Sequence, residues 1–167
     1  YVSINRGTVG GGGVTRVGNN NWVMAYCHIA HDCIVGNNTI FANNATLAGH
    51  VEIQDFAILG GFVGVHQFCR VGESSFAAIS AVIVKDVPPF FMVEGNTARA
   101  RAVNREGLKR RGFDPAAIAR WDEARLAALM KEPELGEMWL GNKDAKVTVA
   151  FFSVGEKRVL ARFLRQG

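Results

Sequence analysis

The four histidines of this chain lie close together in the sequence, and one of them precedes an aspartate. They are His28, His31, His50 and His66, and His31 is followed directly by Asp32. A histidine near neutral pH can remove a proton from a hydroxyl group, and an adjacent carboxylate can orient the imidazole and stabilise its protonated form. The pattern therefore predicts a site for general base catalysis, provided that the fold brings these residues together.

A six-residue period runs through the part of the chain that contains these histidines. Twelve apolar residues recur at this spacing: Val17, Val23, Ile29, Val35, Phe41, Leu47, Ile53, Leu59, Val65, Val71, Ala77 and Ile83. Four positions after each of the first eleven comes a small or compact residue: Asn21, Cys27, Cys33, Thr39, Ala45, Val51, Ala57, Val63, Cys69, Ser75 and Ala81. This period fits neither an α-helix nor a single β-strand. It is typical of a hexapeptide-repeat β-helix, in which three short strands form one triangular coil of about eighteen residues.

The predicted fold is an all-β left-handed parallel β-helix, followed by a small α-helical C-terminal domain. Each repeat should point one aliphatic and one small side chain inward. Glycine and asparagine crowd the corners, as in Gly18-Asn19-Asn20, and we expect them there because they tolerate positive φ. The three cysteines, at 27, 33 and 69, fall in the small inward column. We interpret them as buried thiols of a protein in a reducing cytoplasm.

Two interruptions of the period indicate the domain boundaries. The run Gly10-Gly11-Gly12-Gly13 breaks the phase and predicts a flexible loop at about 9–14, without the lysine that would close a phosphate-binding loop. Asp86-Val87-Pro88-Pro89 ends the repeats, because prolines lack the N–H that a ladder needs. We expect a β-helix over residues 1–90, incomplete at its N-terminus, and a connecting segment with a helical domain over 91–167. Asp114-Pro115 should begin a helix that continues to about Lys131.

The net charge of +4 is carried mainly by the second half of the chain. One stretch holds Arg99, Arg101, Arg105, Lys109, Arg110 and Arg111. This stretch is either a solvated helix face or a site for a phosphate or an acidic protein. No aromatic residues interleave with it, so nucleic acid is not an expected partner. No apolar run is long enough to insert into a membrane.

Stacking of eighteen-residue coils predicts which side chains meet. Residues eighteen apart should lie above one another, about 4.8 Å apart, so Asp32 should stack under His50. His31, Gly49 and Gln67 should form a second column, in which Gly49 leaves an open notch beside the imidazole. A backbone N–H at Gly49 could then stabilise a developing oxyanion. A histidine base and an oxyanion donor together indicate acyl transfer from an activated donor to a sugar or another alcohol.

A zinc site is the alternative chemistry for the same histidines. Some hexapeptide β-helices are γ-class carbonic anhydrases, which hold zinc with three histidines, and His28 and His31 lie on one coil. The ligand pattern of that class does not match here, so we predict no metal site. A non-catalytic trimeric scaffold that only binds a nucleotide sugar is a third interpretation.

Five segments resemble one enzyme family much more specifically than the period does. They are His28-Ile29-Ala30-His31-Asp32-Cys33, Asn43-Asn44-Ala45-Thr46-Leu47-Ala48-Gly49-His50-Val51, Val65-His66-Gln67-Phe68-Cys69, Asp86-Val87-Pro88-Pro89, and residues 104–113 from Asn104 to Phe113. They are similar to the bacterial acyl-[acyl-carrier-protein]–UDP-N-acetylglucosamine O-acyltransferases of lipid A biosynthesis. The resemblance covers residues 1 to about 118.

The resemblance implies a cytoplasmic homotrimer that needs no cofactor and moves a 3-hydroxyacyl group from acyl carrier protein to the 3-hydroxyl of UDP-N-acetylglucosamine. It implies His31 as general base, Asp32 as its orienting partner and Gly49 as oxyanion donor. The substrate-contacting positions that it implies are His28, His50, His66, Gln67, Asn104, Glu106, Arg110 and Arg111. The basic stretch would then meet a diphosphate and an acidic carrier protein.

Two further positions bear on the acyl chain. Ile79 stands where the resemblance implies a residue that gauges acyl length, with Phe76 nearby. A bulky side chain there predicts a shorter acyl group than glycine would admit. A related acyltransferase that uses a 3-amino sugar nucleotide is the alternative within the same superfamily.

Overall fold

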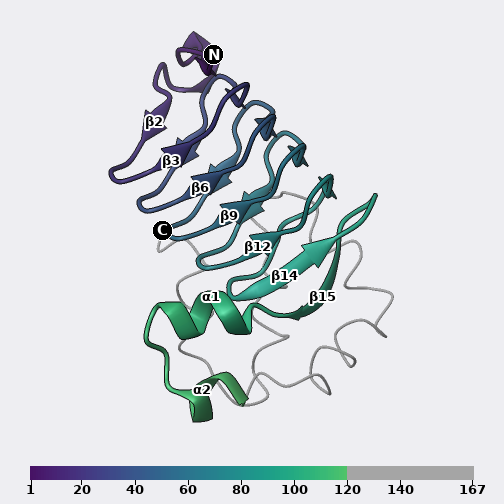
Figure 1. Cartoon of the computed structure of the whole chain (residues 1–167). Coiled ribbons are helices and arrows are strands. Elements are labelled where there is room, and N and C mark those ends of the chain that lie inside the picture. Colours follow the sequence, from purple (N-terminus) through teal and green to yellow (C-terminus); the bar gives the residue numbers. More distant parts are fainter. Residues whose placement is uncertain (120–167) are drawn as a thin grey trace.

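The computed structural model describes residues 1–119 and contains a parallel β-solenoid of about four turns (Figure 1). Its strands are β1 (Ser3–Ile4), β2 (Arg16–Val17), β3 (Trp22–Val23), β4 (His28–Ile29), β5 (Ile34–Val35), β6 (Ile40–Phe41), β7 (Thr46–Leu47), β8 (Glu52–Ile53), β9 (Ile58–Leu59), β10 (Gly64–Val65), β11 (Arg70–Val71), β12 (Phe76–Ala77) and β13 (Val82–Ile83). Each strand from β2 to β13 ends on one of the twelve predicted apolar residues, so the six-residue period is confirmed.

Three parallel sheets form the faces of the solenoid. Their strand orders are β1-β4-β7-β10-β13, β11-β8-β5-β2, and β14-β12-β9-β6-β3. The last sheet thus includes β14 (Phe91–Glu94), and β15 (Arg99–Val103) extends it. Successive coils pair in a register of eighteen residues, as in Ile34 opposite Glu52. The pairing of β1 with β4 spans 25 residues instead, as in Ser3 opposite His28. The additional residues belong to the excursion between β1 and β2.

That excursion contains a short 3₁₀ turn, η1 (Val9–Gly11), within the loop predicted at about 9–14. It is not a free loop, because Thr8 at its start donates two hydrogen bonds to the Asp32 side chain. The excursion thus contacts the coil through Thr8 and Gly11, and the flexibility that the sequence predicts for it stays a prediction.

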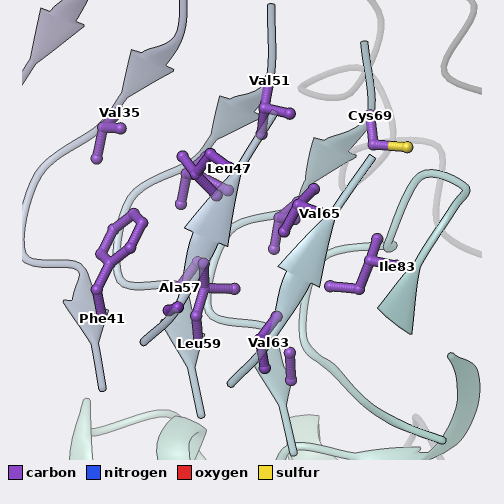
Figure 2. Packing of buried hydrophobic residues seen from close by; sticks show 14 of the residues in the cluster. Val35, Phe41, Leu47, Val51, Ala57, Leu59, Val63, Val65, Cys69 and Ile83 are labelled. Atoms are coloured by element: carbon purple, nitrogen blue, oxygen red, sulfur yellow. The ribbon is translucent and has the colours of Figure 1, made fainter. Parts of the chain in front are cut away.

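The core is a column of side chains that runs along the solenoid (Figure 2). From Ile29 to Ile83 every predicted aliphatic position is at most 3% exposed. The small column is likewise buried from Cys27 to Ala81, and all three cysteines are free thiols. Val17 remains 40% exposed because its coil has few neighbours on one side. Burial of each aliphatic side chain contributes roughly 1.5–3 kcal/mol.

The residue with positive φ at each corner does not stand at the glycine positions, where the sequence predicts it. One residue in each repeat has positive φ, and it directly precedes the small inward residue: Asn20, Tyr26, Asp32, Asn38, Asn44, His50, Phe56, Phe62, Phe68, Ser74 and Ser80. The glycines of the coils are not among them. Gly18 and Gly72 instead lie where a Cβ atom would approach the next coil within 2.5 Å. Asparagine was thus placed correctly and glycine was not.

A hairpin closes the solenoid where a connecting segment was expected. β14 (Phe91–Glu94) pairs in parallel with β12, and β15 (Arg99–Val103) pairs antiparallel with β14. Phe91 and Val103 form a second small core with two residues of the helices that follow, Leu108 and Ile118.

Two short helices follow the hairpin. In α1 (Arg105–Arg110), Asn104 accepts a hydrogen bond from Gly107 N–H; in α2 (Pro115–Ala119), Asp114 accepts one from Ala116 N–H. The predicted helix start at Asp114-Pro115 is confirmed. Its continuation to Lys131 and the rest of the 91–167 domain lie outside the described residues. Within residues 1–119 no helix is long and apolar enough to cross a membrane.

The surroundings of the Asp86 carboxyl group disfavour its ionised form. Burial raises the pKa of this carboxyl from 3.8 to about 6, although Arg70 N–H donates a hydrogen bond to it. The folded state therefore binds the proton more tightly than the unfolded state, and it loses stability as the pH rises through about 6.

We expect Asp86→Asn to raise the free energy of unfolding at pH 8 by about 2–3 kcal/mol at most, because the amide keeps the acceptor and removes the charge. The difference in the free energy of unfolding between variant and parent should vanish near pH 4, where the Asp86 carboxyl of the folded protein is protonated. Thermal unfolding across this range measures it, with Asp114→Asn, at an exposed aspartate, as the control. An Asp86→Asn protein that is less stable than the parent at pH 8 would contradict the conclusion that the charge of Asp86 destabilises the fold.

Candidate active site

The structure brings His31, Asp32 and His50 together at one corner of the solenoid. His31 Nδ1 lies 2.8 Å from Asp32 Oδ2, and His50 Nε2 lies 3.8 Å from the same oxygen. The two imidazole rings meet edge to face, with centroids 5.2 Å apart. His31 and Asp32 follow β4 and His50 follows β7, on successive coils. The predicted stacking of Asp32 under His50 is therefore observed.

Asp32 is an almost fully covered carboxylate, with 1% of its side chain exposed. Thr8 donates its hydroxyl to Oδ2 at 2.6 Å and its backbone N–H to Oδ1 at 2.9 Å. The Thr8 hydroxyl, with smaller help from His31, lowers the pKa of Asp32 to about 2 against the opposing effect of burial. Asp32 is thus ionised at neutral pH. Because a carboxylate only accepts hydrogen bonds, it favours the proton of neutral His31 on Nδ1 and leaves Nε2 as the basic nitrogen.

The His31 imidazole lies against Gly49, and this contact requires glycine. A Cβ atom on Gly49 would come within 2.5 Å of His31 Cε1. The notch that the sequence predicts therefore exists, but the imidazole edge fills it instead of leaving it open. Among the described residues, none accepts a hydrogen bond from the Gly49 N–H. The side chain of His31 is 43% exposed, so a substrate can approach the imidazole, whereas Gly49 is buried beneath it.

Phe68 extends the same corner and was not predicted. Its ring stacks on His50 with centroids 4.7 Å apart and planes 12° apart, and Phe68 is 52% exposed. Asp32, His50 and Phe68 are each eighteen residues apart, so the coil period was the signal that could have found it. The His50 ring thus contacts the rings of both His31 and Phe68.

The remaining predicted residues of the coils lie near this corner without joining the His31 group. His28, on β4, shares a 2.7 Å hydrogen bond with the Ser3 hydroxyl. His66 lies 3.1 Å from the Gln67 carbonyl oxygen, and both residues are exposed. Within residues 1–119, none of these three forms a hydrogen bond, an ion pair or a ring contact with His31. Their roles in binding stay predictions.

The predicted residues around α1 lie against a different corner. Asn104 donates its side-chain amide to the Ser74 carbonyl at 2.8 Å. The Arg111 guanidinium lies 3.6 Å from the Phe56 ring centroid and 3.3 Å from a Glu73 carboxylate oxygen. These contacts hold α1 against the solenoid. Within one copy of the chain, Asn104 and Arg111 therefore lie at this second corner and not at the corner of His31.

The other predicted positions lie on α1 and on the coil that contains β12. Glu106 and Arg110 are exposed on α1. Ile79 is 71% exposed, and Phe76, on β12, is half-buried. No contact tests their predicted part in binding or in acyl length.

A metal ion is the alternative occupant of this corner. One ligand atom from each of His31, Asp32 and His50 lies within 4.8 Å of the others. Both carboxylate oxygens already accept hydrogen bonds, however: Oδ1 from the Thr8 N–H, and Oδ2 from the Thr8 hydroxyl and His31. The observed donors therefore favour a hydrogen-bonded His–Asp pair as the working state.

A solenoid of hexapeptide coils with a His–Asp pair at one corner defines a hexapeptide-repeat transferase. The model of the family described as "Bacterial transferase hexapeptide (six repeats)" matches residues 14–49. A second model, "Udp N-acetylglucosamine O-acyltransferase; Domain 2", matches residues 86–134. The chain belongs to the acyl-[acyl-carrier-protein]–UDP-N-acetylglucosamine O-acyltransferase family, which confirms the resemblance found in the sequence.

Individual relatives agree with this family. The O-acyltransferase of that name from Thiobacillus denitrificans is 59% identical over 119 residues, which cover 71% of this chain and 46% of that protein. The one from Stenotrophomonas maltophilia is 45% identical, with coverage of 96% and 64%. The structure of LpxA from Acinetobacter baumannii has a TM-score of 0.79 at 36% identity and covers 96% of this chain and 57% of its own. The chain thus spans about half to two thirds of the length of these relatives.

The contact between His31 and Gly49 gives a testable prediction. In Gly49→Ala the new Cβ atom should push the imidazole away and lengthen the distance from His31 Nδ1 to Asp32 Oδ2 beyond hydrogen-bonding range. Gly64→Ala is the control, because a Cβ atom there meets nothing within 4 Å. Crystal structures of both variants measure the distance. A 2.8 Å distance retained in Gly49→Ala would show that the position of the His31 imidazole does not depend on its contact with Gly49.

Proposed function

We propose that this protein transfers a 3-hydroxyacyl group from acyl carrier protein to the 3-hydroxyl of UDP-N-acetylglucosamine, in the first step of lipid A biosynthesis. The observation that carries the proposal is the ionised, covered Asp32 beside the half-exposed His31. The identity of the two substrates is inferred from the family, because its members are named for acyl carrier protein and UDP-N-acetylglucosamine.

In this mechanism His31 is the general base. Asp32 holds the Nδ1 proton, so Nε2 removes the proton of the sugar hydroxyl while its oxygen forms a bond to the thioester carbonyl carbon. The charge of the tetrahedral intermediate develops on the former carbonyl oxygen, where the Gly49 N–H donates a hydrogen bond. When the intermediate collapses, the carbon–sulfur bond breaks, and protonated His31 returns its proton to the leaving thiolate.

The usual magnitudes show that these groups suffice for a large acceleration. A positioned general base contributes about 10²–10⁴-fold, and one oxyanion donor about 10²–10³-fold. Asp32 remains ionised at any pH well above 2, so it stabilises the imidazolium throughout the working range. The mechanism needs no metal or organic cofactor.

The partners follow from charge and exposed surface. The basic stretch from Arg99 to Arg111 is suited to a diphosphate and an acidic carrier protein. Large apolar side chains remain exposed on the solenoid, among them Trp22, Tyr26 and Phe62 at 61–65%. Such surface is typical of a face covered by another subunit, and it supports the homotrimer, with sites between subunits, that the resemblance implies. The residues around α1 would then serve a neighbouring subunit's site. The cytoplasmic location is proposed from the resemblance alone.

The test is mass-spectrometric detection of acylated UDP-N-acetylglucosamine from a panel of 3-hydroxyacyl carrier proteins. The natural full-length protein should form product, and His31→Ala should lower the rate by about 10²–10⁴-fold at unchanged thermal stability. A His31→Ala protein as active as its parent would exclude His31 as the base.

The same assay separates the alternatives. No product with any donor, together with bound zinc in elemental analysis, would favour a zinc enzyme. Faster acylation of the 3-amino analogue would assign an amine acceptor. Binding of UDP-N-acetylglucosamine without turnover would indicate a scaffold.

Acyl length gives a separate prediction. Ile79→Gly removes an exposed aliphatic side chain, so the preferred donor should shift to a longer 3-hydroxyacyl chain, with turnover on the original donor reduced. Competition between donors of different length in one reaction measures the shift. An unchanged preference would remove Ile79 from the account of acyl selectivity.

A further inference from the structure

The excursion between β1 and β2 is a closed, hydrogen-bonded turn. At its base the backbone of Gly7 passes so close to Gly13 and Val14 that a Cβ atom on Gly7 would lie 2.0 Å from Val14 N. At its tip Thr8 caps η1, with its hydroxyl accepting a 3.1 Å hydrogen bond from the Gly11 N–H. Its carbonyl accepts another from the Gly13 N–H at 2.8 Å.

This turn covers the Asp32 carboxylate. The Thr8 hydroxyl and N–H donate to the two carboxylate oxygens, one each. Gly11 lies over the carboxylate so closely that a Cβ atom would come within 2.2 Å of Asp32 Cγ. The Asp32 N–H donates to the Thr15 hydroxyl at 2.9 Å, on the returning limb of the excursion. Three residues of the excursion thus contact Asp32.

The coil alone does not bury a side chain at this position. Asp32 has a φ of 60°, like the other corner residues. At equivalent corners Tyr26, Phe62 and Phe68 are 52–61% exposed, whereas Asp32 is 7% exposed. Ser74 is the other buried corner, at 1%, and there Asn104 packs on the coil and donates a hydrogen bond to the Ser74 carbonyl. The difference arises because the excursion packs on the Asp32 corner. The covered state of the His–Asp pair is therefore a property of the turn around Thr8.

We propose that Thr8 is a positioning residue for His31, acting through Asp32. The inference rests on the proposed function, in which His31 is the general base. The Thr8 hydroxyl donates to the same oxygen, Oδ2, that faces His31 Nδ1, while the N–H fixes the other oxygen. Rotation of the carboxylate is thus blocked, and His31 is held with its proton on Nδ1 and Nε2 toward the substrate.

The ionisation of Asp32 depends on the same contact. The Thr8 hydroxyl is the largest cause of its lowered pKa, and the titratable groups that face it are His31, His50 and the Cys33 thiol. Without the hydroxyl, the pKa of Asp32 should rise from about 2 toward its ordinary value of 3.8. Asp32 then still stays ionised at neutral pH, so the loss of activity should come from the freed rotation of the carboxylate and not from its protonation.

The experiment compares Thr8→Val, Thr8→Ser and Thr97→Val in the natural full-length protein. Valine keeps the shape of Thr8 without its hydroxyl, serine keeps the hydroxyl, and Thr97 is an exposed threonine at the far end of the solenoid. The first readout is the ¹⁵N NMR tautomer of His31, which needs no substrate. The second is kcat and KM as a function of pH.

For Thr8→Val we expect a mixed His31 tautomer and a kcat lowered roughly 10-fold, with KM little changed and the loss present across the pH range. Thr8→Ser and Thr97→Val should match the parent. An unchanged His31 tautomer and an unchanged kcat in a folded Thr8→Val protein would overturn the proposal. If the tautomer shifts but His31→Ala keeps full activity, the positioning role stands and the proposed function fails.

Discussion

Parallel pairing at a fixed offset of eighteen residues determines where the side chains of the coils from β2 to β13 lie. Each coil must place its aliphatic and small residues over those of the previous coil, since the strands share one ladder. The same constraint aligns the corners, so that Asp32, His50 and Phe68 form one column. The candidate site is thus a consequence of the repeat, because two coils each supply part of it. A residue inserted between β4 and β7 would separate these parts.

The departure from the repeat is as important for the site as the repeat itself. Corner residues are exposed unless something packs on them, and a fully solvated aspartate would hold a histidine weakly. The excursion between β1 and β2 packs on the Asp32 corner and leaves the neighbouring His31 half-exposed. The protein therefore combines a rigid ladder, which aligns the groups, with one closed turn, which controls the electrostatics of the pair.

Much of this arrangement was predictable from the sequence, and the limits have physical causes. The period predicted the strand positions, the inward columns and the stacking of Asp32 with His50, because each follows from a fixed register. The contact of Thr8 with Asp32 spans 24 residues, which is no multiple of the coil, so no periodic argument could find it. The hairpin of β14 and β15 was missed because its pairing depends on tertiary contact beyond the prolines. Glycine was misplaced because close approach between coils, and not positive φ, requires it at Gly18 and Gly72.

The central claim is that His31 Nε2 is the base for a sugar hydroxyl, and a crystal structure with bound UDP-N-acetylglucosamine tests it most directly. The distance to measure joins His31 Nε2 and the oxygen of the 3-hydroxyl, in the natural full-length protein. The account predicts hydrogen-bonding range, about 2.6–3.2 Å, with His31 Nδ1 still on Asp32. A sugar bound with its 3-hydroxyl out of reach of His31, while another side chain contacts that oxygen, would contradict the account.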